Sequence, residues 1–147
     1  MTKKDDIPFE ELSFCMNANL RRTMRATNRL YNAALKPVDL KATQFTLLAV
    51  IASQKSTPIT KLSEALEMDR TTLTRNLAPL TKKGWVELEK ESDERIRPVA
   101  ITQSGLDLLQ QAVPLWRNAQ GKVTAALGTS GIENANAALT AIRKHTM

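Results

Sequence analysis

Apolar positions in the middle of the chain repeat with helical spacing over residues 62–66 and again over residues 73–80. The residues that form these two faces are Leu62, Ala65, Leu66, Leu73, Leu77 and Leu80. Asp69 lies between them and suits the N-cap of the second helix, because its carboxylate can accept from free first-turn amides. Gly84 suits the end of that helix. Two short helices joined by a tight turn predict a helix-turn-helix, with the second helix over residues 70–83.

The spacing then changes to the alternation of strands. Residues 85–89 alternate apolar and polar, and so do residues 99–101 after Pro98. The loop between them is highly charged, and residues 57–59 could add a third short strand. Helix, helix, strand, charged loop and strand are the order of a winged helix, so we expect a mainly α fold with a small β-wing.

The outward face of the second helix is polar and has no acidic residue, which is what a helix in the DNA major groove requires. Its members are Arg70, Thr71, Thr72, Thr74, Arg75 and Asn76. An ordinary amphipathic helix with a solvated face is the alternative. Pro79 interrupts the helix, so either the helix bends there or only its first two turns enter the groove.

Further cations flank this helix. Arg95 in the wing loop is our candidate for the minor groove. Arg97 is expected to be held by Asp93 or to touch phosphate. The other candidate phosphate contacts are Lys61, Ser63 and Lys82.

Helical apolar stripes also occupy both ends of the chain, over residues 9–36 and 102–145. Pro37 should end the first stripe, and a further helix should run from Thr43 to Ser53. Thr102 suits the cap of the last region, where we expect a kink at Pro114 and breaks at Gly128 and Gly131. The outer helices hold more apolar surface than the lobe of residues 40–101 can cover, which predicts a second copy in a two-fold dimer.

Length, composition and charge limit the possible class of protein further. At 147 residues the chain is expected to form one domain over residues 1–147, without a membrane span or signal peptide. The net charge of +6 favours a polyanionic partner, yet residues 61–100 hold eight basic and eight acidic residues. The arrangement of charge on each face, rather than the total, therefore supports binding to double-stranded DNA.

Four arginines lie off the apolar stripe of the first helix. They form a solubilising face, or one or two of them line an anion-binding cleft or approach DNA phosphates. They are Arg21, Arg22, Arg25 and Arg29. With one cysteine and one histidine, a zinc site cannot be built from nitrogen and sulfur ligands, and no catalytic motif supports an enzyme. The single Cys15 excludes a disulfide framework and favours the cytoplasm.

The chain resembles the MarR family of bacterial winged-helix transcription regulators over roughly residues 12–142. The resemblance is carried by L-K-A-T-Q-F-T-L-L, D-R-T-T-L-T-R-N-L, K-K-G-W-V, S-D-E-R-I-R and I-T-Q-S-G. The family usually has a hydroxyl cap where this chain has Lys41, so Thr43 is expected to cap instead. The resemblance implies a dimer of intertwined first and last helices, a palindromic operator, and no cofactor.

The resemblance also implies control by a small aromatic or phenolic anion bound between the lobe and the dimer helices. Candidate lining residues are Met16, Leu20, Arg21, Phe45 and Trp116. We expect a repressor. One alternative is a redox sensor that uses Cys15. Peroxide-sensing relatives carry tyrosines that hydrogen-bond the reactive thiolate, whereas Tyr31 is the single tyrosine of this chain. The other alternative is a winged helix that binds protein instead of DNA.

Overall fold

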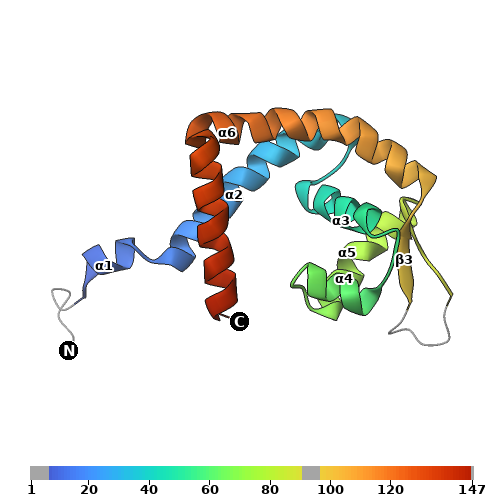
Figure 1. Cartoon of the computed structure of the whole chain (residues 1–147), viewed down its shortest axis with the longest axis horizontal. Helices are drawn as coiled ribbons and strands as arrows, with labels where there is room; N and C mark the ends of the chain where they lie inside the picture. The colour runs from blue at the N-terminus through green and yellow to red at the C-terminus, as the bar shows by residue number, and fades with distance from the viewer. Residues whose placement is uncertain (1–6, 91–96, 147) are drawn as a thin grey trace.

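The computed structural model describes residues 7–90 and 97–146. Figure 1 shows a small lobe beneath two long helices that cross each other. The elements in chain order are α1 (Phe9–Ser13), α2 (Met16–Leu35), the 3-10 turn η2 (Lys36–Val38), α3 (Ala42–Ser53), β1 (Ser56–Pro58), α4 (Ile59–Ala65), α5 (Arg70–Lys82), β2 (Val86–Leu88), β3 (Pro98–Ile101) and α6 (Gln103–Thr146). The structure confirms the mainly helical fold with a small wing.

The N-terminal stripe forms two helices, so the prediction of one continuous helix from residue 9 was wrong. The chain leaves helical geometry at Phe14 and Cys15, where the backbone amides donate to Glu11 and Leu12 in tight three-residue steps. No residue of α1 is buried, so no packing holds it in line with α2. The far end matches the prediction, because α2 ends at Leu35 and Pro37 sits in the following turn.

The start of α3 is fixed by side chains that the sequence did not suggest. Oδ1 of Asn32 accepts from the Ala42 amide at 2.8 Å, and Oε1 of Gln44 accepts from the Lys41 amide at 3.0 Å. Lys41 is the N-cap residue, so the expectation that Thr43 would cap this helix was wrong. The Asn32 bond ties the N-terminus of α3 to the long helix α2.

The three strands form one antiparallel sheet in the order β1-β3-β2. Thr57 pairs with Val99 on one side of β3, and Leu88 pairs with Val99 on the other. The third strand expected near residues 57–59 is thereby confirmed at Ser56–Pro58. The sheet joins the segment before α4 to the base of the wing.

The core of the lobe is built from the apolar faces of α3, α4, α5 and the sheet. Its fully buried side chains include Leu48, Ile51, Leu62, Leu73, Leu77, Leu80, Val86 and Val99. Each buried leucine of this kind stabilises the fold by about 1.5–3 kcal/mol relative to leaving it exposed. This core fixes the orientation of α5, whose opposite face is left free.

α6 begins at a double contact made by Thr102, as the sequence predicts. The Thr102 hydroxyl donates to the Gly84 carbonyl at 2.6 Å and accepts from the Gly105 amide at 3.1 Å. The helix then passes over the lobe, packs against α2 and turns sharply towards its C-terminus (Figure 1). The turn is at Gly128, with φ 73° and ψ 167°, and no other residue of α6 leaves helical geometry. The expected break at Gly131 was therefore wrong, and Pro114 lies inside a helix that continues through it.

The outer helices leave large apolar side chains in solvent, as their stripes predict. The exposed set on α1, α2, α6 and the link between α1 and α2 includes Phe9, Leu12, Phe14, Met16, Met24, Leu106, Leu127 and Leu139, with Phe14 reaching 80% exposure. No described helix is long and apolar enough to cross a membrane. An exposed apolar surface of this extent is typical of a surface that another chain covers.

Candidate nucleic-acid interface

The start of α5 is organised by Asp69, which was the predicted N-cap. Its Oδ1 accepts from the Thr72 amide at 2.8 Å, and its Oδ2 accepts from the Thr72 hydroxyl at 2.6 Å. The hydroxyl bond, followed by the amide bond, holds the pKa of Asp69 below its ordinary value. The carboxylate thus stays ionised at the positive end of the helix dipole. Thr72 orders the helix start, and its proposed contact with DNA stays a prediction.

One side of α5 faces the wing across a hollow of about 580 Å³. Arg70, Thr74 and Ala78 line it at helical steps of four, and Arg97 borders it from the base of the wing. Lys82 also lines this hollow from the last turn of α5. Three predicted DNA contacts that carry positive charge therefore surround one groove, with no acidic side chain among its described lining residues.

The other side of α5 faces α3 across a smaller hollow of about 170 Å³. Arg75, Asn76 and Pro79 line it from α5, while Lys41 and Thr43 line it from the start of α3. Nδ2 of Asn76 lies 3.4 Å from Sδ of Met68, so this amide is partly engaged within the protein. Lys41 and Thr43 were absent from our predicted contacts. Their place at a helix start was visible in the sequence, but their closeness to Arg75 was not.

Pro79 does not end α5, which stays helical to Lys82. The Pro79 carbonyl accepts from the Lys83 amide at 3.1 Å, and Gly84 follows with φ 73°. Thr71, Thr74 and Arg75 are exposed on the first half of the helix. The side chains predicted to contact bases thus lie on the half that a helix-turn-helix presents to DNA.

The remaining predicted contacts lie around this face. Lys61 is exposed on α4, whereas Ser63 is half-buried and its carbonyl accepts from the Met68 amide at 2.9 Å. Arg97 is half-buried, and its carbonyl accepts from the Ile59 amide. Arg95 and Asp93 lie outside the described residues. The minor-groove role of Arg95 and the expected pairing of Arg97 with Asp93 therefore stay predictions.

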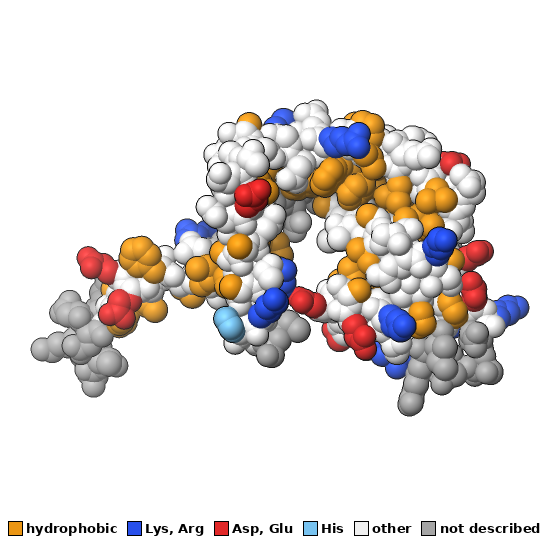
Figure 2. Space-filling view, viewed as in Figure 1, with side chains coloured by type: hydrophobic (Ala, Val, Ile, Leu, Met, Phe, Trp, Pro, Cys, Tyr) orange, Lys and Arg blue, Asp and Glu red, His pale blue; other side chains and the backbone are white. Residues whose placement is uncertain are grey.

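Among the described residues, no acidic side chain lines either of the two hollows. Figure 2 shows basic and acidic side chains mixed over this part of the molecule, in keeping with its balanced charge. Oε2 of Glu67 lies 3.4 Å from Nε of Arg143 on α6, and Oε1 of Glu89 accepts from the Ser56 hydroxyl at 3.3 Å. The charge balance of residues 61–100 thus does not prevent α5 from presenting a cationic face.

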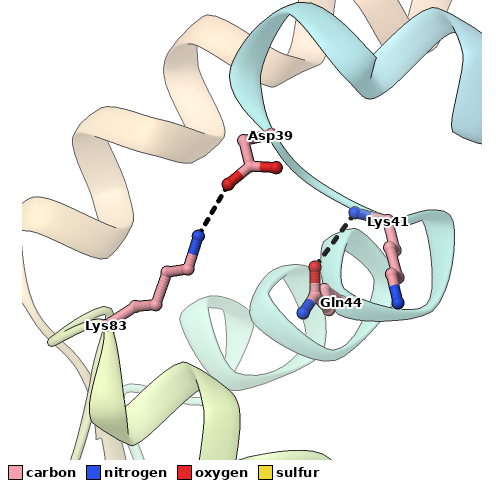
Figure 3. A network of polar contacts seen from close by, with 4 residues as sticks. All are labelled: Asp39, Lys41, Gln44 and Lys83. Atoms are coloured by element: carbon pink, nitrogen blue, oxygen red, sulfur yellow. Dashed lines mark hydrogen bonds and ion pairs between the residues drawn. The ribbon is translucent and has the colours of Figure 1, made fainter.

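The connection between α2 and α3 is tied to the end of α5 by a polar network (Figure 3). Nζ of Lys83 lies 2.7 Å from Oδ2 of Asp39, and it also lies 5.0 Å from the centre of the Trp85 ring. The Lys83 contact, followed by Lys41, lowers the pKa of Asp39. The Asp39–Lys83 pair joins the turn after α2 to the C-terminal end of α5.

A separate cleft lies between α2, α3 and α6. The rings of Phe45 and Trp116 stack there with centroids 5.9 Å apart and an interplanar angle of 18°. They border a hollow of about 230 Å³ together with Thr27, Asn28, Tyr31, Leu35, Ala42, Thr43 and Thr46. The Tyr31 hydroxyl donates to Oε1 of Gln120, and burial raises the pKa of Tyr31.

The five residues proposed to line an effector pocket do not meet within this chain. Phe45 and Trp116 do, but Met16, Leu20 and Arg21 lie outside this cleft, nearer the start of α2. Arg21 instead borders another hollow together with Cys15, which is exposed. In the described part of the chain, no group of three His, Cys, Asp or Glu residues could hold a metal ion.

The sequence is similar to a known family profile and to bacterial transcription regulators. The sequence profile of the MarR family matches residues 40–96. The multiple antibiotic resistance protein MarR of Salmonella typhimurium is 33% identical over 106 residues, which cover 71% of this chain and 69% of the relative. The transcriptional repressor MprA of Escherichia coli is 29% identical over 132 residues, covering 88% and 74%.

Two solved complexes with DNA are similar in structure. The M. tuberculosis transcriptional regulator MosR bound to DNA has a TM-score of 0.78 and 36% identity, covering 90% of this chain and 99% of that one. A cysteine-to-serine mutant of E. coli MarR bound to operator DNA has a TM-score of 0.80 and 27% identity, covering 93% and 99%.

Proposed function

Since this chain belongs to the MarR family of winged-helix transcription regulators, we propose that it is a repressor that binds a palindromic operator as a homodimer. The observation that carries this proposal is the exposed face of α5. Its hydroxyls and guanidiniums stand between two hollows whose described lining contains cations and no carboxylate. Such a face suits base edges at its centre and phosphates at its borders.

Each side of the face has a distinct role in this proposal. Thr71, Thr74 and Arg75 are exposed on the first two turns, so they are the candidates for reading bases. Arg70, Lys82 and Arg97 surround the larger hollow and neutralise the phosphates of one strand. Lys41 at the start of α3 contacts the backbone on the other side.

The dimer is supported by the apolar side chains that α1, α2 and α6 leave in solvent. A two-fold pair of lobes would place its recognition helices about one helical turn of DNA apart, or ~34 Å. A half-site on each lobe then gives a palindrome. The regulated genes follow from the operator once it is known.

We further propose that a small aromatic molecule in the Phe45–Trp116 cleft controls the spacing of the two lobes. A ligand acts by binding the non-productive spacing more tightly than the productive one. The described residues around the cleft offer hydroxyls, an amide and stacked rings, but no charged group. This lining favours an uncharged aromatic ligand over the anion that the family resemblance implied.

The decisive experiment is selection of bound fragments from random genomic DNA at two salt concentrations. It compares wild type, Arg75→Ala and a control, Arg117→Ala, which removes an exposed arginine on α6. We expect a palindrome, with Arg75→Ala costing about 1–3 kcal/mol if Arg75 reads a base, or lowering the salt slope by about one if it holds a phosphate. Folded wild type that enriches no sequence would refute the proposal and favour a winged helix that binds protein.

A second candidate is control through the thiol of Cys15. The favouring observation is that this cysteine is exposed and borders a hollow with Arg21, Arg22 and Arg25. Peroxide should then release wild-type protein from its operator but leave Cys15→Ser bound. Equal responses of both proteins would exclude Cys15 as the sensor.

A further inference from the structure

A further hollow adjoins the one that lies between α5 and the start of α3. Arg75 and Pro79 line the first of them from α5, and Lys83 follows at the next step of four residues, on the same side of the helix. Lys41 and Gln44 line both hollows, and Lys83 borders the second, which has a volume of about 340 Å³. The proposed DNA interface is therefore continuous with a second cavity beside the C-terminal end of α5.

This second cavity is rich in lysine, and we term it the lysine hollow. Lys36, Lys41 and Lys83 line it and are exposed, and Asp39 is the one acidic residue of its described lining. Nζ of Lys83 lies 2.7 Å from Oδ2 of Asp39 (Figure 3). Neither Lys36 nor Lys41 is in an ion pair with a described residue. The lysine hollow thus keeps an excess of positive charge, which attracts anions.

The two hollows together have the length of a short stretch of DNA backbone. Residues 75 and 83 are eight positions apart, which corresponds to about 12 Å along α5. One DNA strand carries a phosphate about every 3.4 Å of helix axis, so a strand along this side of α5 passes about three phosphates. A backbone that contacts Arg75 and Lys41 therefore brings its next phosphates to the lysine hollow.

Asp39 already holds an anionic group at the place where such a phosphate would meet Lys83. Its side chain is 89% exposed, and Lys83 is its one ion-pair partner among the described residues. Exposed ion pairs of this kind are weak in water, so a phosphate can replace the carboxylate. The backbone of Asp39 is left-handed, with φ 52° and ψ 41°, a conformation that Asp, Asn and Gly adopt more readily than other residues.

We propose that the Asp39 carboxylate competes with a DNA phosphate for Lys83, so that Asp39 limits the affinity of the chain for its operator. This rests on the DNA-binding function proposed above and adds a contact beyond the first half of α5. While Asp39 is paired with Lys83, it neutralises that cation and repels the approaching backbone. A restrained affinity keeps the complex reversible, because an effector then needs a smaller differential affinity to release the operator.

Asp39→Asn tests this competition, because it removes the charge and keeps the shape and the tolerance for left-handed backbone. The assay is fluorescence anisotropy of the labelled duplex recovered by genomic selection, over a series of salt concentrations. The variant should bind about two- to fivefold more tightly at low salt. Its log–log salt dependence should be steeper by up to about 0.9, since one more phosphate is neutralised. Adding Lys83→Ala to Asp39→Asn should abolish the steeper slope.

Glu67→Gln is the matched control for removing one carboxylate from an ion pair. Its partner Arg143 lines neither hollow, so the salt slope of this variant should equal that of wild type. Circular dichroism would show that each variant is folded. Asp39→Gly, which also accepts a left-handed backbone, replaces Asp39→Asn if the asparagine variant does not fold.

Equal affinity and slope in Asp39→Asn and wild type would overturn the competition, and so would weaker binding by the variant. An equal rise of slope in Glu67→Gln would also count against it, because the total charge rather than Lys83 would then be the cause. Wild type that selects no duplex would refute the proposed DNA-binding function and this proposal with it. A selected duplex that Arg75→Ala weakens and Asp39→Asn leaves unchanged would overturn this proposal alone.

Discussion

Replacing Gly105 with alanine tests how closely α6 is joined to the base of the wing. Gly105 is buried in the first turn of α6, and its amide donates to the capping hydroxyl of Thr102. A methyl group there would lie inside contact distance of the Trp85 carbonyl oxygen, 2.7 Å from Cγ1 of Ile101 and 3.1 Å from the Trp85 carbonyl carbon. Two of these three atoms belong to the backbone and cannot move without shifting β2.

The expected cost follows from this crowding. Overpacking of a filled site typically destabilises by about 1–3 kcal/mol, which exceeds the gain of about 0.5–1 kcal/mol from replacing a helical glycine. Gly121→Ala provides the matched control, because nothing lies within 4 Å of its added methyl group. The same chemical change should therefore lower the free energy of unfolding at residue 105 and raise it at residue 121.

Urea unfolding at one fixed protein concentration measures both variants, since the stability of a dimer depends on concentration. If Gly105→Ala were as stable as wild type, the close approach of α6 to Trp85 would be wrong. If both variants lost stability equally, helix geometry rather than contact would be the cause.

Three further outcomes are expected. Leu73→Ala should lower the free energy of unfolding by about 2–5 kcal/mol in the same urea assay, because the Leu73 side chain is fully buried and anchors α5. Thr71→Ala should change the free energy of unfolding little, because Thr71 is exposed. Asp69→Ala should lower the melting temperature at pH 7. Hydrogen bonds from Thr72 lower the folded-state pKa of Asp69 below 3.8. The stabilisation by Asp69 is therefore present above that pH and is lost as the pH falls through the folded-state pKa. A difference in melting temperature between wild type and Asp69→Ala that persists unchanged in strong acid would contradict this. Asp39→Asn should reduce the melting temperature only slightly in low salt and not at all in high salt, because the Asp39–Lys83 pair is exposed. A large loss of melting temperature that is independent of salt would show another role for Asp39.

Local signals in the sequence were sufficient for most of the lobe. Asp69, Gly84 and Thr102 act within a few residues of their own positions, so their capping roles could be read from neighbours in the chain. Alternation of polar and apolar residues similarly located β2 and β3. These features depend on backbone geometry, which short-range sequence determines.

Features that depend on distant partners were missed. The cap of α3 uses Asn32, ten residues earlier in the chain. Phe45 and Trp116 stack between α3 and α6, and only the family resemblance had placed these two residues in one pocket. The break at Phe14 and Cys15 reflects missing packing, which a regular apolar stripe cannot reveal. For the proposed DNA interface, residue types identified α5, but only the fold showed that Lys41 lies beside Arg75.

The positive φ of Gly128 makes this residue a joint between two straight segments of α6. The segment from residue 129 to 146 is about 27 Å long at 1.5 Å per residue. A rotation of about 10° at the joint therefore moves its tip by about 5 Å. In the proposed homodimer both copies carry this joint, so a rotation at Gly128 would act on both halves of the molecule. Paired DNA half-sites require a fixed separation of ~34 Å, so the proposed regulator would bind its operator at one setting of the two joints and lose it at another.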